Sequence, residues 1–170
     1  MDAFECIASK LDVREFRGEK VPDDVVVRVL EAARSTGSGS NTQHWHFILV
    51  RSTGDLSQLA ESLPYGPWVG DADFAVIVLT SSRWPFHSFD AGRAVQDMQL
   101  AAWNQGVASC LTTVFTEVSM RIELNIPMEF SISAVVGFGY PQRKVLGKKK
   151  RKPLSEIVSL ERYGNPFVQR

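Results

Sequence analysis

Residues 90–115 read DAGRAVQDMQLAAWNQGVASCLTTVF, and this stretch decides the fold. Its first part, Asp90–Gln105, predicts a long helix, because apolar residues recur there at the i, i+1, i+4, i+7 and i+8 spacing of one buried helical face. Gly106 is expected to end the helix, since glycine readily adopts the backbone conformation that closes helices. The next segment, Cys110–Phe115, is rich in β-branched and apolar residues and predicts a strand.

Helices and strands are predicted on both sides of this stretch. The expected helices are 3–11, 22–35, 55–63, 117–124 and 153–160, and the expected strands are 45–50, 74–79 and 133–138. This order does not alternate strictly between strand and helix, which indicates an α+β fold. The sequence contains no internal repeat and no linker, so we expect residues 1–170 to form a single domain.

The overall composition narrows the class of protein. Hydrophobic residues make up 44% and charged residues 22%, a globular balance, and the formal net charge is +0, which argues against a nucleic-acid binder. The two cysteines are far apart and have no zinc-binding spacing, so we expect a reducing cytoplasm and no metal site. Neither a leader pattern nor a run of about 18 apolar residues is present, so we expect a soluble protein without membrane attachment.

Three polar segments, distant in sequence, carry the candidate chemistry. Lys10 and Arg14 lie near the N-terminus, Lys149 and Arg151 alternate in a basic run, and residues 38–43 form a loop of hydroxyls and amides. A phosphate monoester is held by cationic donors that converge from different segments. A flavin ring needs amide and backbone partners along its polar edge and apolar packing elsewhere. Taken singly, the basic run is typical of a solvated surface. The loop, taken singly, is typical of the segment that ends a helix.

Four stretches together resemble the FMN-dependent nitroreductase family over nearly the whole chain. They are SKLDVREF (9–16), LEAARSTGSGSNTQHW (30–45), the helix and turn of 90–110, and GFGYP (137–141) followed by RKPLSEIV (151–158). Each stretch alone is a weak signal, but the four in this order are specific. The resemblance implies a nitroreductase-like fold with a central, mostly antiparallel sheet flanked by helices, and a homodimer.

The resemblance also implies an FMN site. The residues that it places at the cofactor are Lys10, Arg14, Ser38, Ser40, Asn41, Gln43, Thr112, Thr113, Lys149 and Arg151. Lys10 and Arg14 would bind the phosphate or ribityl chain from one side, and Lys149 and Arg151 from the other. The 38–43 loop would line the flavin. The two threonines would lie near the reactive edge of the ring. In this family two subunits share each flavin site, so the partner of this chain is expected to be a second copy.

Aromatic residues precede the long helix. Trp84, Phe86 and Phe89 are expected to shape the substrate space as a lid, and the alternative is that they pack in the core.

Three positions depart from the family pattern. Asp12 stands where the family has serine, and Gly37 and His44 stand where it has prolines. A carboxylate beside a phosphate is unfavourable, so we expect Asp12 to turn away or to pair with Arg14.

The resemblance implies an FMN-dependent oxidoreductase. NADH or NADPH would pass a hydride to the flavin, and an electron-poor acceptor such as a quinone or nitroaromatic would then take the electrons in ping-pong order. The cofactor carries the chemistry and solvent can supply the proton, so no catalytic side chain is expected. Two alternatives remain open: biosynthetic oxidative flavin chemistry, and a non-enzymatic flavin carrier or sensor. The acceptor and the choice between NADH and NADPH are also open.

Overall fold

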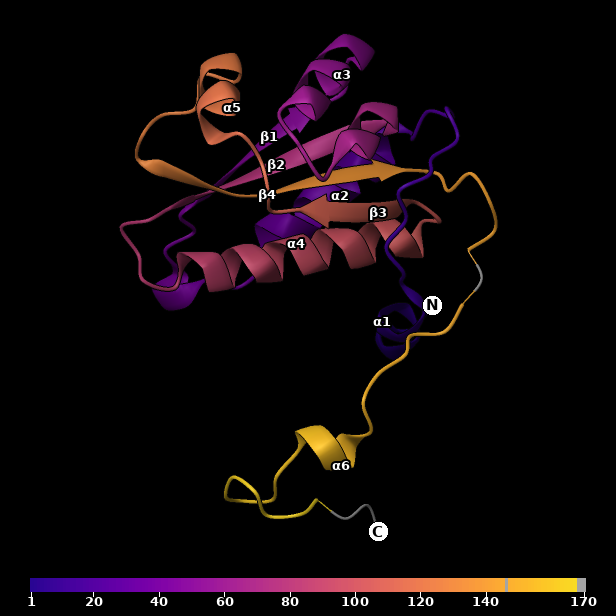
Figure 1. Ribbon diagram of the computed structural model, residues 1–170, viewed down its shortest axis with the longest axis vertical. Helices are drawn as coiled ribbons and strands as arrows, with labels where there is room; N and C mark the ends of the chain where they lie inside the picture. The colour runs from indigo at the N-terminus through magenta and orange to yellow at the C-terminus, as the bar shows by residue number, and fades with distance from the viewer. Residues whose placement is uncertain (146, 168–170) are drawn as a thin grey trace.

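The computed structural model describes residues 1–145 and 147–167, and its centre is a four-stranded sheet (Figure 1). The strands are β1 (Trp45–Val50), β2 (Phe74–Ser81), β3 (Ala108–Thr112) and β4 (Phe130–Gly139). Their order across the sheet is β1-β2-β4-β3, and every neighbouring pair is antiparallel. The expected α+β fold with an antiparallel sheet is confirmed.

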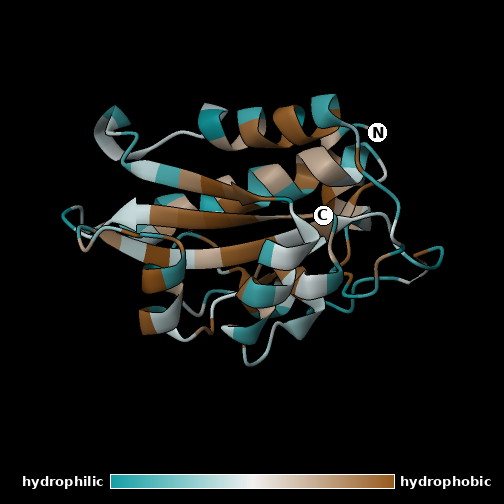
Figure 2. Cartoon of the chain, turned by 90° about the horizontal axis from the view of Figure 1, so that it is seen from above, coloured by the Kyte–Doolittle hydropathy of each residue, from teal (hydrophilic) through white to brown (hydrophobic). Residues whose placement is uncertain are grey.

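Helices cover both faces of the sheet. The helices α2 (Asp23–Ser35) and α4 (His87–Asn104) pack on one face, and α3 (Thr53–Glu61) and α5 (Glu117–Glu123) cover the other, with the short helix η2 (Pro67–Asp71). The hydrophobic colour in Figure 2 runs along the strands between these layers. Because β2 and β4 lie in the middle of the sheet, both of their faces are buried, which explains their continuous apolar sequences.

Helix α4 begins and ends for identifiable reasons. It starts at His87, three residues before the predicted start, and the Asp90 carboxylate then lies in its first turn, where the helix dipole favours negative charge. Gly106 has a φ of 78°, and the Val107 N–H donates to the Ala102 carbonyl at 3.0 Å. The helix therefore closes at the glycine, as predicted.

The predicted extent of the third strand is wrong. The sequence predicts a strand at Cys110–Phe115, but β3 pairs with β4 only over Ala108–Thr112. After that point the Val114 N–H donates to the Thr112 hydroxyl at 3.3 Å, which turns the chain out of the sheet. Thr113, one of the residues expected at the cofactor, therefore lies beyond the strand.

The segment that follows α1 (Ala3–Ser9) runs along the free edge of β3. The Val13 N–H donates to the Ser109 carbonyl at 3.1 Å, and Asp12 forms a parallel bridge with Ser109. The Lys10–Arg14 segment is thereby attached to the sheet edge, beside the residues expected to face the flavin.

Residues 147–167, which we call the C-terminal arm, extend away from the body of the chain (Figure 1). The arm contains α6 (Leu154–Ile157), which is shorter than the predicted helix at 153–160. Leu154, Ile157, Leu160 and Tyr163 are all exposed on it. The arm therefore presents apolar side chains that have no core of their own to join.

The strand predicted at 45–50 is confirmed with the same ends, and the remaining predicted helices and strands are present with shifted ends. Within the part of the chain that the structure describes, no helix combines the length and apolar character needed to cross a membrane.

Candidate functional site

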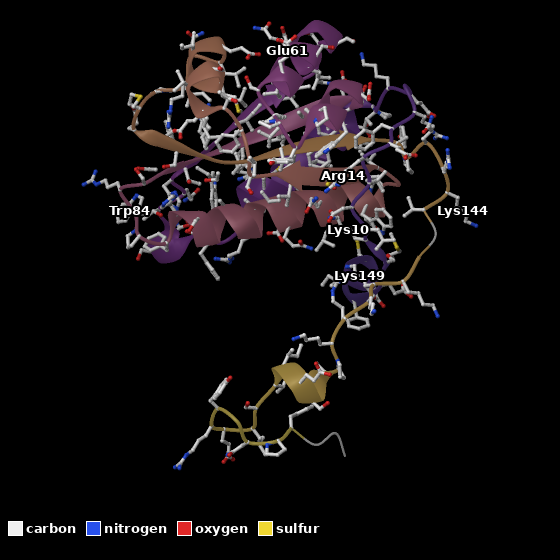
Figure 3. All side chains as sticks on the ribbon, in the orientation of Figure 1. Lys10, Arg14, Glu61, Trp84, Lys144 and Lys149 are labelled. Atoms are coloured by element: carbon white, nitrogen blue, oxygen red, sulfur yellow. The ribbon has the colours of Figure 1, made fainter. Side chains whose placement is uncertain are left out.

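The basic run is brought to the N-terminal segment. The Lys149 ammonium donates a hydrogen bond to the Ile7 carbonyl near the end of α1, and Lys149 and Arg151 line a cavity together with Ser9. Figure 3 shows Lys10, Arg14 and Lys149 on the same side of the molecule. Cations from two segments more than a hundred residues apart thus lie on the same side of the molecule.

Asp12 pairs with Lys10, so the expected pairing with Arg14 is wrong. The Lys10 Nζ lies 2.5 Å from Asp12 Oδ1, and the lysine side chain is only 9% exposed. In extended backbone, residues i and i+2 point to the same side, which explains the pairing. An ammonium group has three donors. Asp12 therefore holds Lys10 in place while leaving donors for another oxygen.

Arg14 is exposed and lies beside β3. Its contact with the Cys110 side chain raises the pKa of Arg14, so this guanidinium is charged at any physiological pH. Arg14 also lines a cavity of about 450 Å³ with Arg143 and Lys144. Sequence reasoning missed these two cations, although they follow directly on the GFGYP motif that closes β4.

A groove of about 450 Å³ opens between α4 and the ends of β3 and β4. The residues that line it are His87, Ser88, Ala91, Gly92, Val95, Gln96, Gln99, Leu111, Thr113, Ser131, Ile132, Ser133 and Ala134. Its volume lies within the range of small-molecule sites, and its surface is mainly apolar although polar side chains of α4 and the sheet also line it.

The two candidate threonines of this region point to different places. Thr113 and Leu111 line the groove, whereas Thr112 is 6% exposed. The Thr112 methyl group would lie 2.9 Å from a Cβ at Gly66, on the other side of the sheet. Alternation along the strand therefore gives the groove Leu111 and Thr113, and sequence reasoning missed Leu111.

Polar groups of the groove are held by neighbours. The buried Gln99 donates its amide to the Ser109 hydroxyl at 3.2 Å. The His87 Nδ1 lies 3.0 Å from the Thr80 hydroxyl, which in turn lies 2.7 Å from that of Ser133. Sequence reasoning missed Gln99, although it continues the helical row of Ala91 and Val95 at i+4 spacing, where a polar residue is conspicuous.

The loop at residues 38–43, which we call the amide loop, has an unusual backbone. Ser40, Asn41 and Gln43 have φ values of 51°, 55° and 47°. Each left-handed residue with a side chain costs about 1–2 kcal/mol, with asparagine the best tolerated. The Ser38 hydroxyl accepts the Gln43 N–H at 2.9 Å and closes the loop. The four expected cofactor residues of this loop therefore lie together in a conformation that needs support from outside.

The aromatic residues lie beside the amide loop. Phe86 packs against Trp84 and His44, with ring centroids 5.8 Å apart in both pairs. A side chain at Gly39 would clash with the Phe86 ring, so this glycine permits the close approach. Phe89 is 70% exposed, and the Arg93 guanidinium lies 6.0 Å from its ring. Phe86 thus supports the loop, while Trp84 and Phe89 are accessible at its rim.

The amide loop and the basic residues lie at opposite ends of α4. The Gly39 N–H donates to Asp90 in the first turn of the helix. The Trp103 indole donates to the Ser9 hydroxyl, and the Cys6 thiol donates to the Leu100 carbonyl, in its last turns. Trp103 lies thirteen positions after Asp90 in the helix, which corresponds to a rise of about 20 Å. One chain therefore does not bring all the predicted cofactor residues together, and Figure 3 shows Trp84 far from Lys10 and Arg14.

Comparisons with known proteins identify the family to which this chain belongs. The sequence profile of the Nitroreductase family matches residues 7–63 and 56–140. A protein of Methanothermobacter thermautotrophicus called "Putative NADH dehydrogenase/NAD(P)H nitroreductase" is 31% identical over 150 residues, which cover 83% of this chain and 78% of that protein. The chain therefore belongs to the nitroreductase family, a family of oxidoreductases.

Solved structures share the fold. A protein with the same description from Bacteroides thetaiotaomicron superposes with a TM-score of 0.86 at 26% identity, over 96% of this chain and 99% of that one. An FMN-dependent nitroreductase from Clostridium difficile superposes with a TM-score of 0.87 at 19% identity, over 94% and 99% of the two chains. The expected nitroreductase-like fold is thereby confirmed.

Proposed function

We propose that this chain binds FMN and transfers reducing equivalents from NADH or NADPH to an electron-poor acceptor such as a quinone or nitroaromatic. The observation that carries the proposal is that Lys149 bonds to the N-terminal segment on the same side of the molecule as Lys10 and Arg14, and that this segment runs along the edge of β3, whose end lines the groove. The chain thus offers cationic donors for the phosphate end of FMN and an apolar groove for its ring, which matches the two chemically different ends of the cofactor.

The donor set fits a phosphate monoester. The Lys10 ammonium has donors beyond the one used by Asp12, and Arg14 presents a guanidinium fork. Lys149 and Arg151 add charge from the opposite segment. Phosphate groups are bound best by charge-assisted hydrogen bonds of this kind. We assign these four side chains to the phosphate and ribityl end of the cofactor.

The groove would take the ring. Leu111 and Thr113 face it from the chain that leaves β3, and Ala91 and Val95 supply apolar surface from α4. When bound, FMN supplies hydride acceptance and donation. The residues of the chain then hold the ring, exclude water from it and leave one face open to NAD(P)H and the acceptor in turn.

The site needs a second copy of the chain. Ser38, Ser40, Asn41 and Gln43 lie at the far end of α4 from the basic residues, about 20 Å away. In a two-fold symmetric pair, the amide loop of the partner can reach the basic end of this chain, and the reverse contact forms at the same time. The exposed apolar side chains of the C-terminal arm, such as Leu154 and Ile157, would be buried against the partner. We therefore propose a homodimer of single-domain subunits, residues 1–170, with two shared sites.

The absorption spectrum of the purified protein tests this function. We expect the bands of oxidised flavin, which bleach when NADH or NADPH is added without oxygen and return when a quinone is added. Absence of flavin from the protein, together with failure to bind added FMN, would contradict the proposal. A bound flavin that neither nucleotide reduces would instead favour the carrier or sensor, or a biosynthetic role with another reductant.

A further inference from the structure

A single buried carboxylate bridges the two ends of the amide loop. Asp90 Oδ2 accepts the Gly39 N–H at 2.9 Å and lies 3.2 Å from His44 Nε2. Gly39 opens the loop, and His44 leads from it into β1. Asp90 is 1% exposed and belongs to the first turn of α4, so the contact ties the loop to a rigid element. The loop between these anchors contains the three residues with left-handed backbone.

The neighbours of Asp90 fix the orientation of its carboxylate. Arg93 Nη1 lies 3.6 Å from Asp90 Oδ1, so a cation faces the second carboxylate oxygen. The His44 ring is buried against Phe86, and to donate to the carboxylate its Nε2 must carry the proton. His44 Nδ1 is buried without a hydrogen-bond partner in the part of the chain that the structure describes. Burying this unpaired nitrogen is costly, so the contact between Nε2 and Asp90 is the polar interaction that offsets the burial of the ring.

We propose that Asp90 is a positioning residue for the cofactor and acts through His44 and Gly39. This inference rests on the proposed function. The strained φ values of Ser40 and Gln43 persist only where surrounding contacts determine them, and the Asp90 contacts do so at both ends. His44 stands at a position where a proline ring would restrict the backbone covalently. In this chain the contact of the His44 side chain with Asp90 performs that restriction.

Amide hydrogen exchange in the flavin-free protein tests directly whether Asp90 holds the amide loop in place. In Asp90→Ala, we expect the Gly39 amide to exchange about tenfold faster or more, because it loses a charge-assisted hydrogen bond. Asp90→Asn retains an acceptor oxygen and should restore part of the protection. Asp24→Ala is the matched control, since Asp24 is also an acidic residue in the first turn of a helix but is exposed. An unchanged Gly39 exchange rate in Asp90→Ala would overturn the inference.

The affinity for FMN, measured from the quenching of its fluorescence, tests whether the Asp90 contacts affect cofactor binding. We expect Asp90→Ala to weaken FMN binding about tenfold, and His44→Ala to do so to a similar extent. In the double variant the losses should not add, because both residues act through the same loop. His44→Gln keeps an amide donor and should recover affinity. If Asp90→Ala does not fold, the pair His44→Ala and His44→Gln decides the question.

The two proposals fail in different ways. If the wild-type protein does not bind FMN, the proposed function is wrong, and the exchange experiment still decides whether Asp90 clamps the loop. If the wild-type protein binds FMN and the affinities of Asp90→Ala and His44→Ala equal that of the wild type, the positioning role is wrong and the proposed function stands.

Discussion

The two ends of α4 hold the two halves of the proposed site by different means. At its start, the amide loop presents neutral groups on a strained backbone that Asp90 and Phe86 support from a buried position. At its end, Lys149 and Arg151 lie on an extended segment, and Arg14 is exposed, whereas Lys10 is held by Asp12. We therefore expect cofactor binding to depend on backbone geometry at the amide loop and on charge at the basic residues. The difference also explains why one half was easier to recognise, since a run of cations is visible in a sequence and a strained loop is not.

The largest expected effect comes from removing charge at the basic end. The double variant Lys149→Ala with Arg151→Ala should lose about 100-fold or more in FMN affinity, because two charge-assisted hydrogen bonds are lost. Titration of FMN fluorescence at fixed ionic strength measures this loss. The matched control is Lys150→Ala with Lys152→Ala, which removes equal charge from the same run. Equal losses in the two double variants would show that the total charge matters and that no specific site exists there.

A mixing experiment tests whether the two halves belong to different chains. One variant carries Arg14→Ala and Lys149→Ala, the other Ser40→Ala and Asn41→Ala, and each alone should bind FMN weakly. When the two variants pair at random, about half of the dimers contain one chain of each kind. In such a dimer one of the two sites combines both intact halves, so about a quarter of all sites should recover wild-type affinity. Co-purification through two different tags isolates the mixed dimer for the titration. No recovery in that dimer would mean that each chain builds its own site.

The smallest expected effect comes from Glu123, which lies on α5 on the face of the sheet opposite α4. Burial, together with the carboxylates of Glu61 and Asp55, raises the pKa of Glu123. A raised pKa means that the folded protein favours the protonated carboxyl, so the stabilisation is present at low pH and is lost as the pH rises through the folded-state value. Glu123→Gln should therefore raise the free energy of unfolding at pH 7 by less than about 1 kcal/mol, since the group is partly exposed and screened.

Denaturant unfolding at two pH values checks that prediction. At about pH 3, where the carboxyl is protonated in both states, the gain should vanish. Affinity for FMN should stay unchanged, because α5 packs on the face of the sheet opposite α4. A change in affinity would show that the site extends around the sheet.

Local patterns in the sequence predicted most of the helices and strands. The apolar rows of α2 and α4 and the continuous apolar runs of β2 and β4 are strong periodic signals. The errors came where non-local contacts decide. The end of β3 depends on where β4 stops pairing with it and on the bond between Val114 and Thr112. The partner of Asp12 depends on which way the extended segment attaches to Ser109.

By itself, the sequence predicted the α+β class, because periodicity is a local property, and its resemblance to the nitroreductase family implied the residues at which a flavin is expected. Only the tertiary structure decided which of these residues meet. It joined Lys149 to the N-terminal segment, placed Thr113 and not Thr112 in the groove, and put the amide loop about 20 Å away at the other end of α4. The physical reason is that packing against a shared sheet sets these distances, and no spacing along the chain encodes them.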